Sequence, residues 1–169
     1  MNELVKLELG SHGAGVAYEY PLSSKLLLDV GTGLGMGYAV DYNRFQASWM
    51  LHDPAAYLRS EIRYLYNRQK RMAKGKSVVH NTGNYIGYQA KFTTARLFNN
   101  STLWEQVTNP MNKVLLNDVH WGIQRPLGEN FLFNLHLGLG YAYDFHFQTG
   151  TVYPAVGTKF SYILLRKRS

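Results

Sequence analysis

The sequence contains no cysteine among its 169 residues, few charged residues (17%) and no long apolar run. The absence of cysteine excludes disulfide bonds, thiolate metal sites and cysteine nucleophiles. No segment approaches the roughly 18 consecutive apolar residues that a membrane-spanning helix requires. The first residues, MNELVKLELG, lack the basic start and apolar stretch of a signal peptide. If the protein is exported, we expect this numbering to begin after a removed signal peptide.

The residues that are abundant favour β-structure. Aromatic residues make up 14% of the chain, including 13 Tyr, and there are 16 Gly. Aromatic side chains favour strands, and glycine favours tight turns. A chain of this length is long enough for one core but too short for a cofactor domain with a separate substrate domain. We therefore expect one all-β domain over residues 1–169.

The stretch LLLDVGTGLGMGYAVD, residues 26–41, allows two interpretations. Its acidic residue followed by Gly-x-Gly-x-Gly resembles the first motif of methyltransferases that bind S-adenosylmethionine. Such a motif should break its alternation at the glycines and continue as a helix. Large apolar residues instead alternate with small or acidic ones as far as Val40, which is the period of a strand. We therefore predict one continuous strand, which LGLGYAYD at 137–144 repeats, and no cofactor.

The two faces of the segment 131–147 differ in a way that favours a membrane strand. Its odd positions are aromatic at both ends and aliphatic in the middle, while its even positions are mostly small or polar. This arrangement is typical of a strand that crosses a bilayer around a narrow lumen. We predict a closed antiparallel up-and-down transmembrane β-barrel of about eight strands, its lumen filled by side chains. Eight strands require Gly10-Ser-His-Gly13 to divide residues 3–20 into two.

The connections are of unequal length. Residues 21–25 and 126–130 form short turns, which we expect on one rim, whereas 41–56 and 97–112 form long loops on the other. The long loops contain Trp49, His52 and Trp104, and such loops are where a barrel would present a recognition surface.

Ionisable residues share the parity that we assign to the lumen. We predict a polar network of Asp29, Glu61, Arg63, Lys91, Asp118, His120, His136, Asp144, His146 and Lys159. Charges inside a barrel must be paired to offset desolvation, so a structural network is our main interpretation. A His beside a Ser and a carboxylate would instead suggest hydrolysis of lipid esters, as in the outer-membrane lipid A deacylases. No local His-x-Ser signature or metal-ligand spacing is present, so we predict no catalytic residue and no metal site.

Two further groups belong to the ends of the barrel. We predict membrane-interface aromatics at Tyr38, Tyr66, Trp121, Tyr141, Tyr143 and Tyr162. We predict a basic periplasmic turn formed by Arg68, Lys70, Arg71, Lys74 and Lys76, either solvated or in contact with anionic lipid headgroups. Nucleic-acid binding would need aromatics interleaved with the basic residues on a solvent-exposed face, so we expect no nucleic-acid partner.

Several stretches resemble the small outer-membrane β-barrel proteins of Bacteroidota-type bacteria. They are Tyr18-Glu-Tyr-Pro21, Glu61-Ile-Arg-Tyr-Leu-Tyr66, Gly83-Asn-Tyr-Ile-Gly87 and Val156-Gly-Thr-Lys-Phe-Ser-Tyr162. The resemblance implies a porin-like architecture in the bacterial outer membrane, with lipid and other cell-envelope proteins as partners and a structural or interaction role. Most members lack an assigned activity, so the resemblance assigns no catalytic residue. The chain departs from many outer-membrane proteins by ending on a basic tail instead of an aromatic residue.

Two other functions remain open at this stage. One is an outer-membrane lipid-modifying hydrolase, and the other is a soluble lipocalin-like carrier, which would need an apolar interior.

Overall fold

The computed structural model describes residues 1–41, 44–98 and 100–168. The described residues form ten strands: β1 (Asn2–Gly10), β2 (Gly13–Pro21), β3 (Leu26–Gly35), β4 (Gly37–Asp41), β5 (Arg44–Ser48), β6 (Ala55–Tyr64), β7 (Gly83–Arg96), β8 (Val114–Leu127), β9 (Phe131–Asp144) and β10 (Thr149–Arg168). Three short helical segments lie between them: α1 (Arg68–Ala73), the 3-10 turn η1 (Val79–Asn81) and α2 (Leu103–Thr108).

Eight of these strands close into one antiparallel barrel, in the order β1-β10-β9-β8-β7-β6-β3-β2. Each strand pairs with its sequence neighbour in the barrel, and β1 closes the barrel by pairing with β10. The predicted division of residues 3–20 is confirmed, because β1 and β2 are joined by a tight turn at which Gly10 pairs with Gly13. Gly13 has a φ of 137°, a conformation that a residue with a side chain rarely adopts. The predicted all-β barrel of about eight strands is therefore confirmed.

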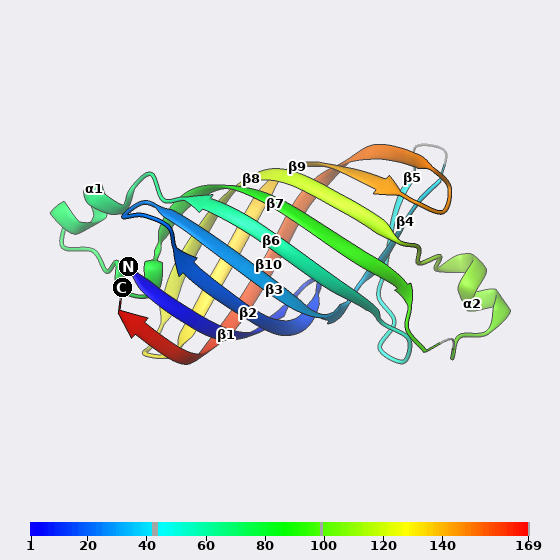
Figure 1. The fold of residues 1–169 in the computed structure, drawn as a ribbon, viewed down its shortest axis with the longest axis horizontal. Coiled ribbons are helices and arrows are strands. Elements are labelled where there is room, and N and C mark those ends of the chain that lie inside the picture. The colour runs from blue at the N-terminus through cyan, green and yellow to red at the C-terminus, as the bar shows by residue number, and fades with distance from the viewer. Residues whose placement is uncertain (42–43, 99, 169) are drawn as a thin grey trace.

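The two ends of the barrel carry different connections (Figure 1). The end that we call the terminal rim carries both chain termini, α1, and the short turns 22–25 and 128–130. The opposite end, the loop rim, carries the β4–β5 hairpin, α2, and the turns 11–12 and 145–148. The predicted short turns and long loops thus lie at opposite ends. The terminal rim also carries the longer segment 65–82, which contains the basic residues.

The predicted continuous strand over residues 26–41 is wrong. β3 ends at Gly35, and residues 37–41 form β4, which pairs with β5 in a separate two-stranded sheet. Gly35 is the last residue of β3 that pairs with either neighbour, opposite Gly13 of β2 and Ala55 of β6. Beyond that point the chain has no ladder partner in the barrel, so it leaves the wall. The β4–β5 hairpin then folds across the loop rim, where Asn112 N–H donates to Tyr38 O at 2.8 Å.

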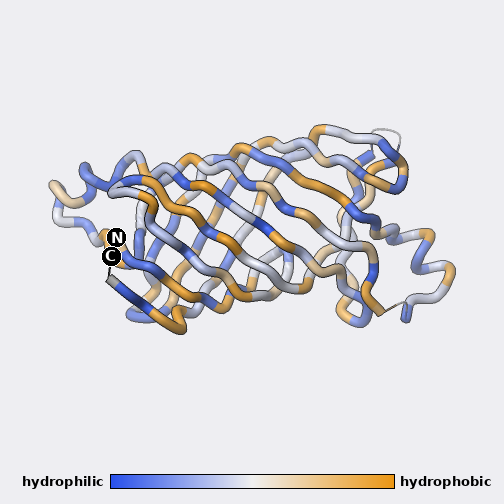
Figure 2. The backbone as a smooth tube through the Cα atoms, viewed as in Figure 1, coloured by the Kyte–Doolittle hydropathy of each residue, from blue (hydrophilic) through white to orange (hydrophobic). Residues whose placement is uncertain are grey.

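Apolar and polar residues alternate along the barrel strands, as the tube in Figure 2 shows. In β9, Leu137 and Leu139 point outward with exposed fractions of 59% and 68%, whereas Leu132, Asn134 and His136 are buried. Glycines at inward-facing positions of the strands leave room for the large side chains of the interior. A Cβ added to Gly122 would lie 2.3 Å from the Tyr85 ring, and one added to Gly87 would lie 2.5 Å from His120 Nε2.

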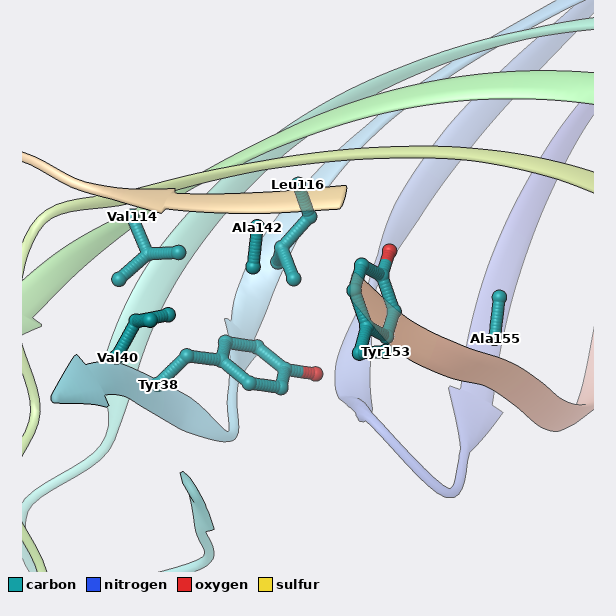
Figure 3. Close-up of a cluster of buried hydrophobic side chains, with 7 residues drawn as sticks. All are labelled: Tyr38, Val40, Val114, Leu116, Ala142, Tyr153 and Ala155. Atoms are coloured by element: carbon teal, nitrogen blue, oxygen red, sulfur yellow. The ribbon is translucent and has the colours of Figure 1, made fainter. Parts of the chain in front are cut away.

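Apolar clusters close both ends of the interior. Near the terminal rim they consist of Leu4, Leu132 and Ile163, and of Leu27, Leu65 and Tyr85. Near the loop rim a larger cluster joins β4 to the inner wall of β8, β9 and β10, as shown in Figure 3, and consists of Tyr38, Val40, Val114, Leu116, Ala142, Tyr153 and Ala155. Between these layers the interior is polar and charged.

The helices lie at the rims and cover neither face of the barrel wall (Figure 1). In the part of the chain that the structure describes, no helix has the length and apolar character to cross a bilayer. The predicted basic turn is in part helical, because Arg68, Lys70 and Arg71 belong to α1 and Lys74 follows it directly.

Candidate functional site

A row of carboxylates crosses the barrel interior. Glu19 of β2 is paired in register with Asp29 of β3, which is paired with Glu61 of β6. All three side chains are buried, with exposed fractions of 0–2%. Like charges directly opposite one another in a sheet are destabilising, so this row requires cations beside it.

Three buried cations neutralise the row. Lys6 Nζ lies 2.6 Å from Asp29 Oδ2 and 3.0 Å from Glu19 Oε2. Arg59 binds Glu8 and lies 2.6 Å from Asp29 Oδ1. Arg63 donates two hydrogen bonds to Glu61, at 2.6 and 2.7 Å, in the bidentate geometry that favours arginine over lysine.

A histidine extends the cluster toward β8. His120 Nδ1 lies 2.5 Å from Asp118 Oδ1, and its Nε2 lies 3.0 Å from Glu61 Oε1. Tyr153 O–H and Gln89 Nε2 donate to the other oxygen of Asp118. We call the connected set the charged network; its members are Lys6, Glu8, Glu19, Asp29, Arg59, Glu61, Arg63, Asp118 and His120.

Apart from His146, the predicted lumen residues divide into three groups. Asp29, Glu61, Arg63, Asp118 and His120 belong to the charged network, and Lys159 approaches it with its Nζ 3.7 Å from Glu61. Lys91 and His136 are buried inside the barrel without an ion pair to any described residue. Asp144 is buried at the loop rim, where it accepts hydrogen bonds from Val40 N–H and Asn112 Nδ2.

The prediction for His146 is wrong. The residue is exposed, because β9 ends at Asp144 and the alternation stops in the turn that follows. His146 N–H donates to Asp144 Oδ1 at 2.8 Å, and its ring contacts Phe147.

Sequence reasoning missed four members of the charged network: Lys6, Glu8, Glu19 and Arg59. The signal for them was available. Lys6 and Glu8 alternate with the outward Leu7 and Leu9, and Arg59 shares the parity of Glu61.

A cavity of about 230 Å³ remains between the charged network and the hairpin at the loop rim. Met36, Tyr38 and Phe45 of the hairpin region line one side. Residues that line the remaining sides include His12, Tyr57, Arg59, Lys91, Asp118, His136, Tyr153 and Lys159. Lys91 is only 5% exposed, and its Nζ lies 4.7 Å from the centre of the Tyr57 ring and 5.2 Å from that of Tyr38.

The predicted interface aromatics are placed outward with one exception. Tyr66, Trp121, Tyr141 and Tyr162 are exposed on the outer wall or its edge, and Tyr143 is partly exposed. Trp121 Nε1 donates to the Tyr66 hydroxyl at 2.8 Å. The prediction for Tyr38 is wrong: it is 3% exposed and lies inside the loop rim, because β4 leaves the barrel wall.

The long loops are fixed by polar contacts around Asp53. Its buried carboxylate accepts hydrogen bonds from Ser101 Oγ (2.6 Å) and Phe98 N–H (3.1 Å), and Arg96 lies 3.5 Å away. Burial alone would raise the pKa of Asp53, but these donors and the guanidinium together lower it below the usual value. His52 lies 3.7 Å from Glu105 of α2, so both long loops meet here.

Among the interior histidines, His12 Nδ1 lies 2.8 Å from the Tyr38 hydroxyl. In the described part of the chain, no serine or threonine hydroxyl hydrogen-bonds to His12, His120 or His136; the partners of His120 are two carboxylates. The described residues also contain no group of three or more histidines and carboxylates arranged to hold a metal ion. The observed arrangement can hold charges in place and can accommodate a small molecule in the cavity.

Comparison with protein-family models, curated proteins and solved structures found no match to this chain.

Proposed function

We propose that this protein is a bacterial outer-membrane β-barrel with a structural or interaction role in the cell envelope, spanning the bilayer with its eight barrel strands. One observation carries the proposal: large apolar side chains cover the outside, while the ionised groups are buried inside. Leu9, Leu58, Val119, Leu139 and Val152 are each 58–68% exposed. An exposed apolar surface of this extent is unfavourable in water and favourable in hydrocarbon.

The height of the apolar surface fits a bilayer. Along β9 the aromatic residues Phe133 and Tyr143 flank Leu135, Leu137 and Leu139. Ten residue steps cover about 33 Å along a strand, which becomes about 25 Å at the usual strand tilt of about 40°. This height matches the apolar band of outer-membrane barrels, which is about 25 Å tall.

The interior argues against a soluble carrier and against an open channel. A lipocalin-like carrier needs an apolar interior, whereas five carboxylates and their cations fill the middle of this barrel. At the loop rim the hairpin packs into the mouth (Figure 3). At the terminal rim the buried Asn81 side chain occupies the opening, where it donates to Asn2 O and Glu19 Oε1, both at 2.7 Å. Neither end of the barrel is therefore left open.

The rims suggest an orientation and a partner class. We place the terminal rim, with its basic residues, in the periplasm, because outer-membrane barrels have short periplasmic turns and long external loops. On the external side, Leu103, Trp104 and Val107 of α2 are 75–82% exposed. Such apolar groups beyond the wall fit contact with another envelope protein, as does the resemblance to Bacteroidota-type barrels. We propose no catalytic role, since no serine or threonine hydroxyl of the described residues hydrogen-bonds to an interior histidine.

Fluorescence quenching by brominated lipid tests the membrane assignment. Trp121 is on the barrel wall, whereas Trp49 and Trp104 are on the external loops. In vesicles with brominated acyl chains, the Trp49→Phe/Trp104→Phe protein should be strongly quenched, because only Trp121 remains. The matched Trp49→Phe/Trp121→Phe protein, which keeps Trp104, should not be. Equal quenching of the two, or a monomer that stays soluble without detergent, would overturn the proposal.

A charge placed on the outer wall provides a second test. Leu139→Arg should lower the free energy of unfolding from vesicles by about 2–4 kcal/mol, the cost of arginine near the bilayer midplane. The matched control Leu103→Arg introduces the same charge on α2, outside the band, and should change stability little. Fractionation of cells that express the intact precursor should recover the protein with outer membranes.

A further inference from the structure

The cavity beneath the hairpin differs from the rest of the interior because it is not filled. At about 230 Å³ it is larger than an engineered apolar cavity of about 150 Å³ that binds benzene. It can therefore hold one ring with a small substituent. Its aromatic side is preformed: the Phe45 ring stacks on Tyr153 at 4.7 Å between centroids and on Tyr38 at 5.5 Å.

Lys91 is the unusual group of this cavity. No carboxylate oxygen of a described residue lies within 4.0 Å of its Nζ, although the side chain is 95% buried. Its register partner on β6 is Arg59, another cation. The rings of Tyr38 and Tyr57 provide only cation–π contacts, which are weaker than an ion pair.

The acids that line the cavity already have partners. Glu8 binds Arg59 and approaches Lys6, and Asp118 binds His120, Tyr153 and Gln89. Glu8 Oε1 has no hydrogen bond, but it lies 3.4 Å from Lys6 Nζ, so no described carboxylate of the cavity can join Lys91 without loss of an existing ion pair. A buried cation in this position is costly unless an anion joins it.

We propose that the cavity is a binding site for a small organic monocarboxylate that has a ring or short apolar body. The carboxylate binds Lys91 Nζ, and the apolar body lies against Phe45 and Tyr153. A single negative charge fits because, among the described residues that line the cavity, Lys91 is the one lysine or arginine without a carboxylate partner. A phosphate dianion would bring excess charge into a buried site. This inference is independent of where the barrel resides in the cell.

Benzoate is a suitable probe, with benzyl alcohol as its uncharged counterpart. We would titrate both into the full chain refolded in detergent micelles, follow binding by calorimetry, and use empty micelles to correct for partitioning. Benzoate should bind saturably and at least about tenfold more tightly than benzyl alcohol, because only the carboxylate forms a charge-assisted contact with Lys91. The absence of saturable benzoate binding, or equal affinity of the two probes, would overturn the proposal.

Variants locate the site. Lys91→Met should weaken benzoate binding by about tenfold or more, Lys91→Arg should retain most of it, and Lys70→Met on α1 at the other rim should leave it unchanged. Ala155→Leu, which extends a lining residue into the cavity, should block both probes and decides the question if Lys91→Met does not fold. Heat-dependent gel mobility verifies the fold of each variant. Full benzoate affinity in a folded Lys91→Met or Ala155→Leu protein would refute the site.

Discussion

The charged network and the cavity lie within the same barrel but are packed in opposite ways. In the network each carboxylate has a lysine, arginine or histidine within ion-pair distance, and the neighbouring strands provide glycines at which the larger side chains approach the backbone. In the cavity Lys91 has no carboxylate partner among the described residues, and space is left beneath the hairpin. The difference indicates that the network maintains the barrel, while the cavity is the part of the interior that can change its contents.

The largest expected effect distinguishes a paired charge from an unpaired one. Glu61→Gln should lower the free energy of unfolding by about 3–5 kcal/mol, because it removes the bidentate partner of the buried Arg63 and one of the two carboxylates that contact His120. Lys91→Met should leave this free energy unchanged or raise it, since it removes a cation that has no ion pair. Urea unfolding from lipid vesicles measures both. Equal losses in the two variants would contradict the comparison.

Added volume should be tolerated only beside the cavity. Gly122→Ala should cost about 1–3 kcal/mol of unfolding free energy, because its Cβ would lie 2.3 Å from the Tyr85 ring. Ala155→Val adds two methyl groups to a residue that lines the cavity, and should cost nothing. The same unfolding assay tests this pair, and a larger loss for the Ala155 variant would show that the cavity is not available space.

Release of the hairpin should loosen the cover of the cavity and leave the neighbouring strands β3 and β6 unchanged. Asp144→Ala removes the acceptor of Val40 N–H (2.9 Å) and Asn112 Nδ2 (2.8 Å), and should lower the local opening free energy of β4 and β5 by about 1–2 kcal/mol. Hydrogen exchange should become faster in β4 and β5 but not in β3 or β6. Gln46→Ala, at an exposed position of β5, is the control and should leave exchange unchanged.

The smallest expected effect is the loss of the Asp53 contacts at low pH. Because the folded-state pKa of Asp53 is lowered, its contribution to stability is complete above the unfolded-state pKa of about 3.9 and is lost as the pH falls through the lower folded-state value. Pepsin should therefore cleave the loop around Phe98 increasingly below that pH. Asp53→Asn should be cleaved at a rate that depends less on pH over the same range. Cleavage of the wild-type loop that did not change with pH would contradict this assignment.

The sequence predicted the barrel wall better than the parts that leave it. Along β9 the parity assigned from the sequence is correct as far as Asp144, because the strand has partners on both sides throughout. The closely similar LGMGYAVD has no barrel partners after Gly35, so the same pattern gives a hairpin and Tyr38 points inward. Which strand ends first depends on its neighbours, and this information is absent from a local repeat.

The same limit applies to the interior. Parity placed Lys91, Glu61 and Arg63 on the inner face but did not show that Glu61 would meet His120 of β8 while Lys91 met only aromatic rings. These contacts depend on register between strands that are far apart in the sequence. β4 was predicted as wall and β5 as part of a long loop, so the cavity that they cover could not have been predicted.

The pairing of β1 with β10 has a consequence for biogenesis. Asn2 is paired with Arg168, so the last seam of the wall can form only after nearly the whole polypeptide has been synthesised. Until then the growing sheet has two unpaired edges and an apolar outer surface, and these features favour edge-to-edge aggregation. Both edges of the growing sheet therefore stay open to pairing with other chains until this seam closes.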